Sequence, residues 1–161
     1  MINIYQKKQV SSYYALQEAN RWKHVANLID DKKNLCREYG VILSYSSELY
    51  LKAILLYYGI MVSGHNLFSL YKKIPESIKN TLNKQYNLKP IEKKDWITGE
   101  IVGTYTGFEE ALHLVSYDFV DLRYIFEKYK DGKAVFVANE VHIEINNILE
   151  KFARNLNFEW V

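Results

Sequence analysis

Apolar residues recur along most of this chain at the spacing of α-helices, in which every third or fourth side chain lies on the same face. The first stripe predicts a helix over residues 11–30. Ser11 and Ser12 can cap its start, and the polar stretch at 30–34 ends it. The stripe consists of Ala15, Ala19, Trp22, Ala26 and Ile29, and it predicts a face that is turned to a core.

The clearest pattern follows, and it predicts a helix over residues 35–58 that is apolar on most sides and ends at Gly59. The apolar stretch within it, residues 41–62, is long enough to cross a bilayer. Glu48, Lys52 and three serines in its first half favour a buried core helix instead. We expect the other helices to pack around this one.

Three weaker patterns follow this helix. Short helices are predicted at 65–73 and, after Pro75, at 76–86. Between 87 and 107 the helical spacing is lost, and three glycines are interspersed with apolar residues. This composition predicts an ordered excursion from the helices, for which a small hairpin is one form.

Helical spacing returns over residues 108–130 and again over 139–155. No internal repeat or linker divides the chain, so residues 1–161 are expected to form a single domain. Short connections between long amphipathic helices favour antiparallel neighbours. The prediction is therefore an all-α fold, an up-and-down bundle of four main helices with two short helices.

Charge and cysteine content narrow the classes of function. The net charge is +2 from 21 basic and 19 acidic residues, which is too balanced to hold nucleic acid without a local basic patch. Cys36 is the only cysteine, so an intrachain disulfide and a cysteine-based metal site are excluded. The N-terminal residues lack the apolar stretch of a signal peptide. We expect a cytoplasmic protein.

Two stretches carry a resemblance to a known family. Residues 47–59 read SELYLKAILLYYG, and residues 64–70 read GHNLFSL. They resemble the core of HEPN domains, helical bundles that bind nucleotides or cut RNA. The resemblance implies a prokaryotic stress, toxin–antitoxin or phage-defence setting, a homodimer, contact with RNA or a nucleotide, and a cognate antitoxin protein as a partner.

A later stretch, residues 118–127, is similar to the arginine-bearing helix of some HEPN relatives. Active HEPN ribonucleases resemble one another in an arginine followed, after four to six residues, by a histidine. After Arg123 the corresponding positions hold Lys128, Tyr129 and Lys130, and none of the other arginines fits the motif. This absence argues against the ribonuclease mechanism usual for the family.

The candidate site residues near this arginine are Arg123, Tyr124 and Glu127. Arg123 and Glu127 stand four apart on the predicted helix, a spacing typical of a solvent-facing ion pair worth a few tenths of a kcal/mol. The alternative is a polar cleft that faces a phosphate or a partner, because Arg123 borders the apolar stripe. Both interpretations remain open.

Glu48 and Lys52 also stand four apart, in the most apolar helix, where an unpaired charge is costly. Either they pair with each other, or Glu48 bridges to Arg123; a structural pair and a chemical role are both open. His65 follows a glycine at a predicted helix start, where a histidine can satisfy backbone groups or pack against the preceding helix, and it is also a candidate binding residue. With no histidine or carboxylate cluster at ligand spacing, no metal and no cofactor are expected.

Three hypotheses for function follow. The first is a HEPN-like protein that touches RNA or a nucleotide without cutting it in the usual way. The second is a divergent, metal-independent endoribonuclease that uses Arg123, with Glu127 and Glu48 as further catalytic candidates. The third is a structural adaptor whose aromatic surface binds another protein. None of the three involves a membrane.

Overall fold

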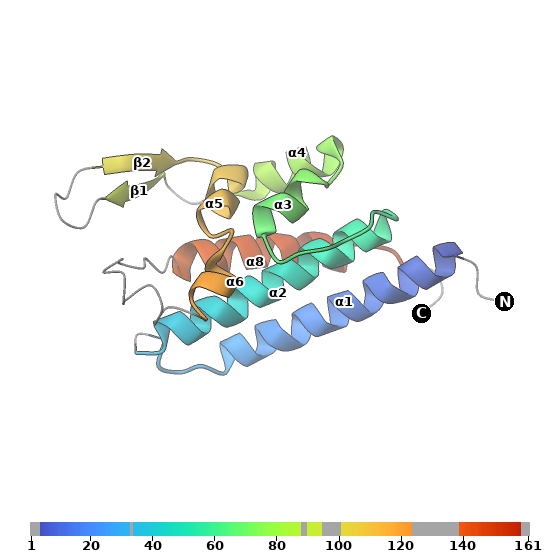
Figure 1. Cartoon of the computed structure of the whole chain (residues 1–161), viewed down its shortest axis with the longest axis horizontal. Coiled ribbons are helices and arrows are strands. Elements are labelled where there is room, and N and C mark those ends of the chain that lie inside the picture. Colours follow the sequence, from blue (N-terminus) through green and yellow to red (C-terminus); the bar gives the residue numbers. More distant parts are fainter. Residues whose placement is uncertain (1–3, 33, 88–89, 95–100, 124–138, 159–161) are drawn as a thin grey trace.

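The computed structural model describes residues 4–32, 34–87, 90–94, 101–123 and 139–158, and its fold is all-α with one small two-stranded ribbon (Figure 1). Three long helices form its main body: α1 (Ile4–Asn27), α2 (Cys36–Tyr57) and α8 (Asn139–Arg154). The predicted fold class is thereby confirmed.

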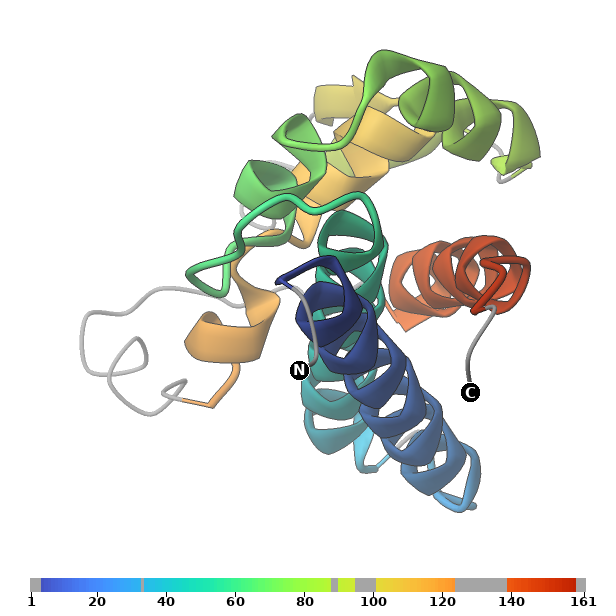
Figure 2. The same cartoon turned by 90° about the vertical axis from the view of Figure 1, so that its right-hand side faces the viewer.

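Helix α2 is the centre of the molecule, as its apolar pattern predicts. Helix α1 runs along one side of it, and a layer made of α3 (Leu67–Lys72), α4 (Glu76–Gln85) and α5 (Phe108–Leu114) covers another side (Figure 2). The short helix α6 (Asp118–Asp121) follows α5 and also contacts α2. Twelve residues of α2 are buried, more than in any other described helix, so α2 contributes more residues to the core than any other described helix.

The end of α2 is fixed by Gly59, as the sequence predicts. Its φ is +74°, a left-handed conformation that favours glycine. The amide of Gly59 donates to the carbonyl of Leu56, and the amide of Ile60 donates to that of Leu55, both at 2.9 Å. These two bonds define a Schellman motif, which satisfies carbonyls left open at the helix end.

The excursion between α4 and α5 contains the hairpin that the sequence allowed. Strands β1 (Ile91–Lys94) and β2 (Ile101–Tyr105) pair in antiparallel fashion, with Ile91 opposite Tyr105 and a register shift between Lys93 and Lys94. This ribbon projects from the helical layer beside α5 (Figure 1).

The start of α1 differs from the prediction. The helix begins at Ile4 and not near Ser11, so Ser12 lies within it and is not a cap. The Ser12 hydroxyl is buried and donates to the carbonyl of Ala53 at 2.7 Å. Trp22, expected on the buried stripe, is 36% exposed.

The predicted helix over residues 108–130 is wrong within its described part. Helix α5 ends at Leu114, and a turn separates it from α6. The Ser116 hydroxyl donates to the carbonyl of Leu112 at 2.8 Å, and its own carbonyl accepts from the amide of Leu67 at 3.3 Å. The contact with the start of α3 uses a carbonyl that a continuous helix would have needed for itself, so tertiary packing decides the break.

The expected up-and-down arrangement also needs correction. Asn146 of α8 contacts Leu43 and Ser47 in the first half of α2, whereas the Tyr57 hydroxyl at the end of α2 donates to the carbonyl of Asn157 beyond α8. Helix α8 therefore runs parallel to α2, and only α1 is antiparallel to it.

Candidate functional site

Halfway along α2, the carboxylate of Glu48 is buried and lies between two basic side chains. Its Oε1 is 2.6 Å from Nζ of Lys52, one turn later on the same helix. Nδ1 of His65 lies 3.0 Å from Oε1 and 3.1 Å from Oε2. The Glu48 side chain is 1% exposed and that of His65 is 58% exposed, so the imidazole connects a buried charge with the surface.

The backbone conformation between α2 and α3 places His65 against α2. Gly64 has a φ of +84°, which reverses the backbone directly before the histidine at little steric cost. Asn66 then caps α3, because its Oδ1 accepts from the amide of Ser69 at 2.7 Å. A left-handed glycine and a helix cap thus fix the position of His65 from both sides.

Pairing explains why a charge is tolerated inside α2. A buried carboxylate loses several kcal/mol of hydration unless a cation and hydrogen bonds replace the water. Lys52 supplies that cation, so of the two predicted arrangements for Glu48 the mutual pair is the one that forms. An imidazole that donates from Nδ1 to Glu48 keeps Nε2 as an acceptor, so it can take up a proton from a bound molecule.

A row of aromatic rings runs from α1 across α2 to α6. The rings of Trp22 and Tyr45 meet edge to face, with centroids 5.3 Å apart. Tyr45 and Phe119 stack almost parallel, at 4.8 Å and an interplanar angle of 16°. Tyr45 and Phe119 are half-buried, while Trp22 is exposed, so the row offers a partly open aromatic surface.

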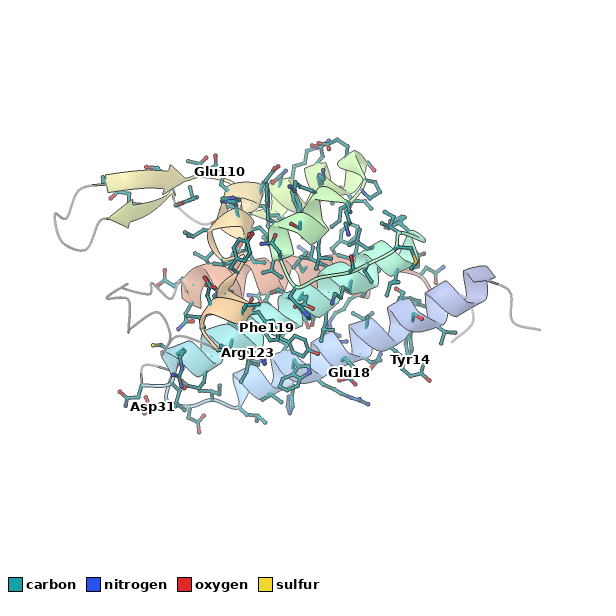
Figure 3. All side chains as sticks on the ribbon, in the orientation of Figure 1. Tyr14, Glu18, Asp31, Glu110, Phe119 and Arg123 are labelled. Carbon is teal, nitrogen blue, oxygen red and sulfur yellow. The ribbon has the colours of Figure 1, made fainter. Side chains whose placement is uncertain are left out.

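Phe119 is the ring at which the candidate residues meet. The guanidinium of Arg123 lies over it, 5.0 Å from the centroid, a cation–π arrangement. The imidazole of His65 lies 5.7 Å from the same ring, tilted by 38°. Figure 3 shows Phe119 and Arg123 close together beside α6. A histidine and an arginine from distant parts of the chain therefore share one aromatic neighbour.

The structure brings together four of the six candidate site residues: Glu48, Lys52, His65 and Arg123. The other two, Tyr124 and Glu127, lie outside the described residues, as do Lys128, Tyr129 and Lys130. The predicted pair of Arg123 with Glu127 and its alternative therefore both remain predictions.

One pair was not found by sequence reasoning. Nε2 of His142, a fully buried side chain on α8, lies 2.8 Å from Oδ2 of Asp118 on α6. This contact anchors the short helix that carries Phe119. Its members belong to separate helices, and neither stands at a diagnostic distance from another polar residue, so no sequence signal marks the pair.

The described residues contain neither a metal-binding cluster nor a membrane-spanning helix. No group of three or more histidine, cysteine, aspartate or glutamate side chains there is placed to hold a metal ion. No described helix is both long enough and apolar enough to span a membrane.

Comparisons with known proteins add no family. No protein-family model, curated protein or solved structure matches the chain.

Proposed function

We propose that this chain is a HEPN-like protein that associates with RNA or a nucleotide through the surface formed by Trp22, Tyr45, Phe119, His65 and Arg123. The proposal is supported mainly by one observation. The two segments that resemble HEPN domains, residues 47–70 and 118–127, meet at Phe119, because His65 from the first and Arg123 from the second both contact its ring. The remaining parts of the proposal are a homodimer, a prokaryotic stress, toxin–antitoxin or phage-defence setting, and a cognate antitoxin protein as partner.

The composition of this surface suits single-stranded RNA. Bases stack on aromatic side chains at about 1–3 kcal/mol each, largely irrespective of sequence. The exposed ring of Trp22 can stack on a base, and the positive charge of Arg123, whose guanidinium lies over Phe119, attracts a phosphate. The near-neutral charge of the whole chain makes such a local site necessary.

Binding of a labelled single-stranded RNA, followed by fluorescence anisotropy, tests the proposal. We expect Trp22→Ala and Arg123→Ala each to weaken binding about ten-fold, the equivalent of about 1.4 kcal/mol. Affinity should fall as salt rises, because phosphate contacts release counterions. Arg154→Ala is the matched control, since Arg154 is an exposed arginine on α8 that pairs with Glu150.

Two outcomes would contradict RNA binding at this surface. Equal affinity of the wild type, Trp22→Ala and Arg123→Ala would place the RNA elsewhere. No binding of RNA or of mononucleotides at low salt would favour the adaptor hypothesis, in which the aromatic row contacts another protein.

A second function is favoured by the contact between Glu48 and His65. A metal-independent ribonuclease needs a group that takes the proton from the 2′-hydroxyl and a cation that stabilises the charged phosphate. His65, held by Glu48, can supply the first, and Arg123 the second. Attack of the 2′-oxygen on the neighbouring phosphorus would form a 2′,3′-cyclic phosphate and break the bond to the 5′-oxygen of the next nucleotide, which leaves as a hydroxyl after it takes a proton from water.

Incubation of a mixed RNA pool with the protein in EDTA separates binding from cutting. Cleavage that is lost in His65→Ala and in Arg123→Ala, and kept in His24→Ala, would support the ribonuclease. His24 is an exposed histidine of α1. RNA that is bound and stays intact would support association without cleavage.

A further inference from the structure

A cleft of about 540 Å³ lies between the end of β2 and the layer of short helices. It is lined by Phe68 of α3, Asn83 of α4, residues 104–107, and Glu109, Glu110 and His113 of α5. None of these residues belongs to the surface around Phe119. Figure 3 labels Glu110 at the junction of the ribbon and α5, which is where the cleft is found.

The two carboxylates of the cleft, Glu109 and Glu110, differ in their hydrogen bonding. Oε2 of Glu110 accepts from the backbone amide of Thr106 at 2.6 Å and from its hydroxyl at 3.0 Å. These bonds lower the pKa of Glu110 below its ordinary value, so it stays charged while it caps the start of α5. Glu109 is exposed and has no hydrogen-bond or ion-pair partner within the described chain. Its charge is available to a ligand.

The remaining lining gives the cleft an aromatic wall, and Nζ of Lys72 lies over its Phe68 ring, 5.0 Å from the centroid. The rings of Phe68 and His113 meet edge to face, with centroids 4.8 Å apart. Neither lysine nor arginine is among the described residues that line the cleft. Two carboxylates with no lysine or arginine among the described lining residues favour a cationic ligand.

Strand β2 adds a further feature to the cleft, an edge that pairs with no other described strand. In the described part of the chain the sheet has only two strands, so β2 pairs with β1 on one edge and with no strand on the other. A two-stranded ribbon is marginal in water, and an unpaired edge offers amide and carbonyl groups to an incoming strand. Thr104 and Tyr105 of β2 line the cleft, so the strand and the carboxylates belong to one surface.

We propose that this cleft binds an extended peptide segment that carries a lysine or arginine. The segment adds to β2 as a further strand through backbone hydrogen bonds, and its cation pairs with Glu109. The apolar part of the same side chain lies against Phe68 and His113. This site does not depend on RNA binding at the surface around Phe119.

A labelled peptide of alternating threonine and lysine is the probe, with binding measured by fluorescence anisotropy. Glu109→Lys should weaken binding at least ten-fold, because it replaces an attractive charge with a repulsive one worth more than about 1.4 kcal/mol. Glu140→Lys is the matched control, since Glu140 is an exposed glutamate near the start of α8. In amide NMR spectra, the peptide should shift the signals of Thr104, Thr106 and Glu109.

Three further measurements complete the test. A peptide with glutamate in place of lysine should not bind, and one in which every backbone amide is N-methylated should lose binding, because it lacks backbone donors. Butylamine carries the cation of a lysine side chain without a peptide backbone. It should not displace the lysine peptide at equal concentration if the cleft recognises a peptide. Equal affinity for Glu109→Lys and wild type, or retained binding of the N-methylated peptide, would overturn the proposal whatever the result with RNA.

Discussion

The buried polar groups on the two sides of α2 differ in how completely they are hydrogen-bonded. On the side that faces α1, the Ser12 hydroxyl donates to the carbonyl of Ala53 at 2.7 Å, and the Ser46 hydroxyl donates to that of Ala19 at 2.9 Å. The Tyr50 hydroxyl donates to Oδ1 of Asn20 at 2.8 Å. Burial raises the pKa of Tyr50 far above its ordinary value. Small residues let the helices approach, and each of these hydroxyls finds an acceptor.

The side of α2 that faces α6 and α8 is less completely paired. Asn146 of α8 donates to the carbonyl of Leu43 and to the hydroxyl of Ser47, yet its own Oδ1 has no hydrogen-bond partner in the described structure. The same holds for Nδ1 of His142 and for the buried hydroxyl of Ser44. Glu48 lies one turn after Ser44 on this side.

This difference in hydrogen bonding indicates that the side of α2 facing α1 is a structural interface, whereas the side facing α6 and α8 carries the candidate site. Buried polar groups that all have partners fix one arrangement of two helices. A buried charge and unpaired polar atoms lower stability, and such violations are expected at functional positions.

The close approach of α1 and α2 predicts a severe effect of a large side chain. Ala19 is fully buried, and its carbonyl accepts from Ser46. Ala19→Leu should lower the free energy of unfolding by about 1–3 kcal/mol, because it forces the helices apart. Tyr14→Leu, at a 64% exposed position of the same helix, should change it by less than about 0.5 kcal/mol. Urea unfolding measures both, and equal effects would mean that the two helices are not tightly packed.

Two serines of α2 give a direct comparison of its sides. Both are fully buried, but Ser46 has an acceptor and Ser44 has none among the described residues. Ser46→Ala should lower the free energy of unfolding by about 1 kcal/mol, whereas Ser44→Ala should be neutral or slightly stabilising, because it removes an unsatisfied group. Helix propensity changes equally in both variants. A larger loss for Ser44→Ala would show that its hydroxyl has a partner, such as a bound water.

The contact between α1 and α8 predicts a small effect that depends on pH. Burial alone would raise the pKa of Glu150, but the hydrogen bonds from Lys23 and Arg154 outweigh it and lower the pKa below the ordinary value of 4.5. This carboxylate therefore stabilises the fold above about pH 4.5, and its contribution is lost as the pH falls through the lowered value. At pH 7, Glu150→Gln should cost less than about 1 kcal/mol.

The measurement is the difference in unfolding free energy between wild type and Glu150→Gln as the pH is lowered from 7 to 3. This difference should shrink, whereas Glu140→Gln, at an exposed position of α8, should differ little from wild type at either pH. A difference that grows in acid would contradict the sign of the pKa change.

The candidate site could be predicted only in part. The four-residue spacing of Glu48 and Lys52 allowed their pair, one of the two arrangements left open for Glu48, because spacing on one helix is a local property. His65 was identified by its glycine and by the family resemblance, but its bond to Glu48 depends on how the loop after α2 turns back. The stacking of Phe119 on Tyr45 joins two helices far apart in the sequence and left no pattern to detect.

The sequence by itself determined the all-α fold, the place of α2 at its centre and the end of α2 at Gly59, since periodicity and backbone preference act over a few residues. Tertiary structure decided what depends on contacts between distant segments. Ser116 bonds to the start of α3 and interrupts the helix expected over 108–130, and Asn146 fixes α8 parallel to α2. Such contacts satisfy backbone and side-chain groups across the molecule, and they can outweigh local preferences of less than about 1 kcal/mol per residue.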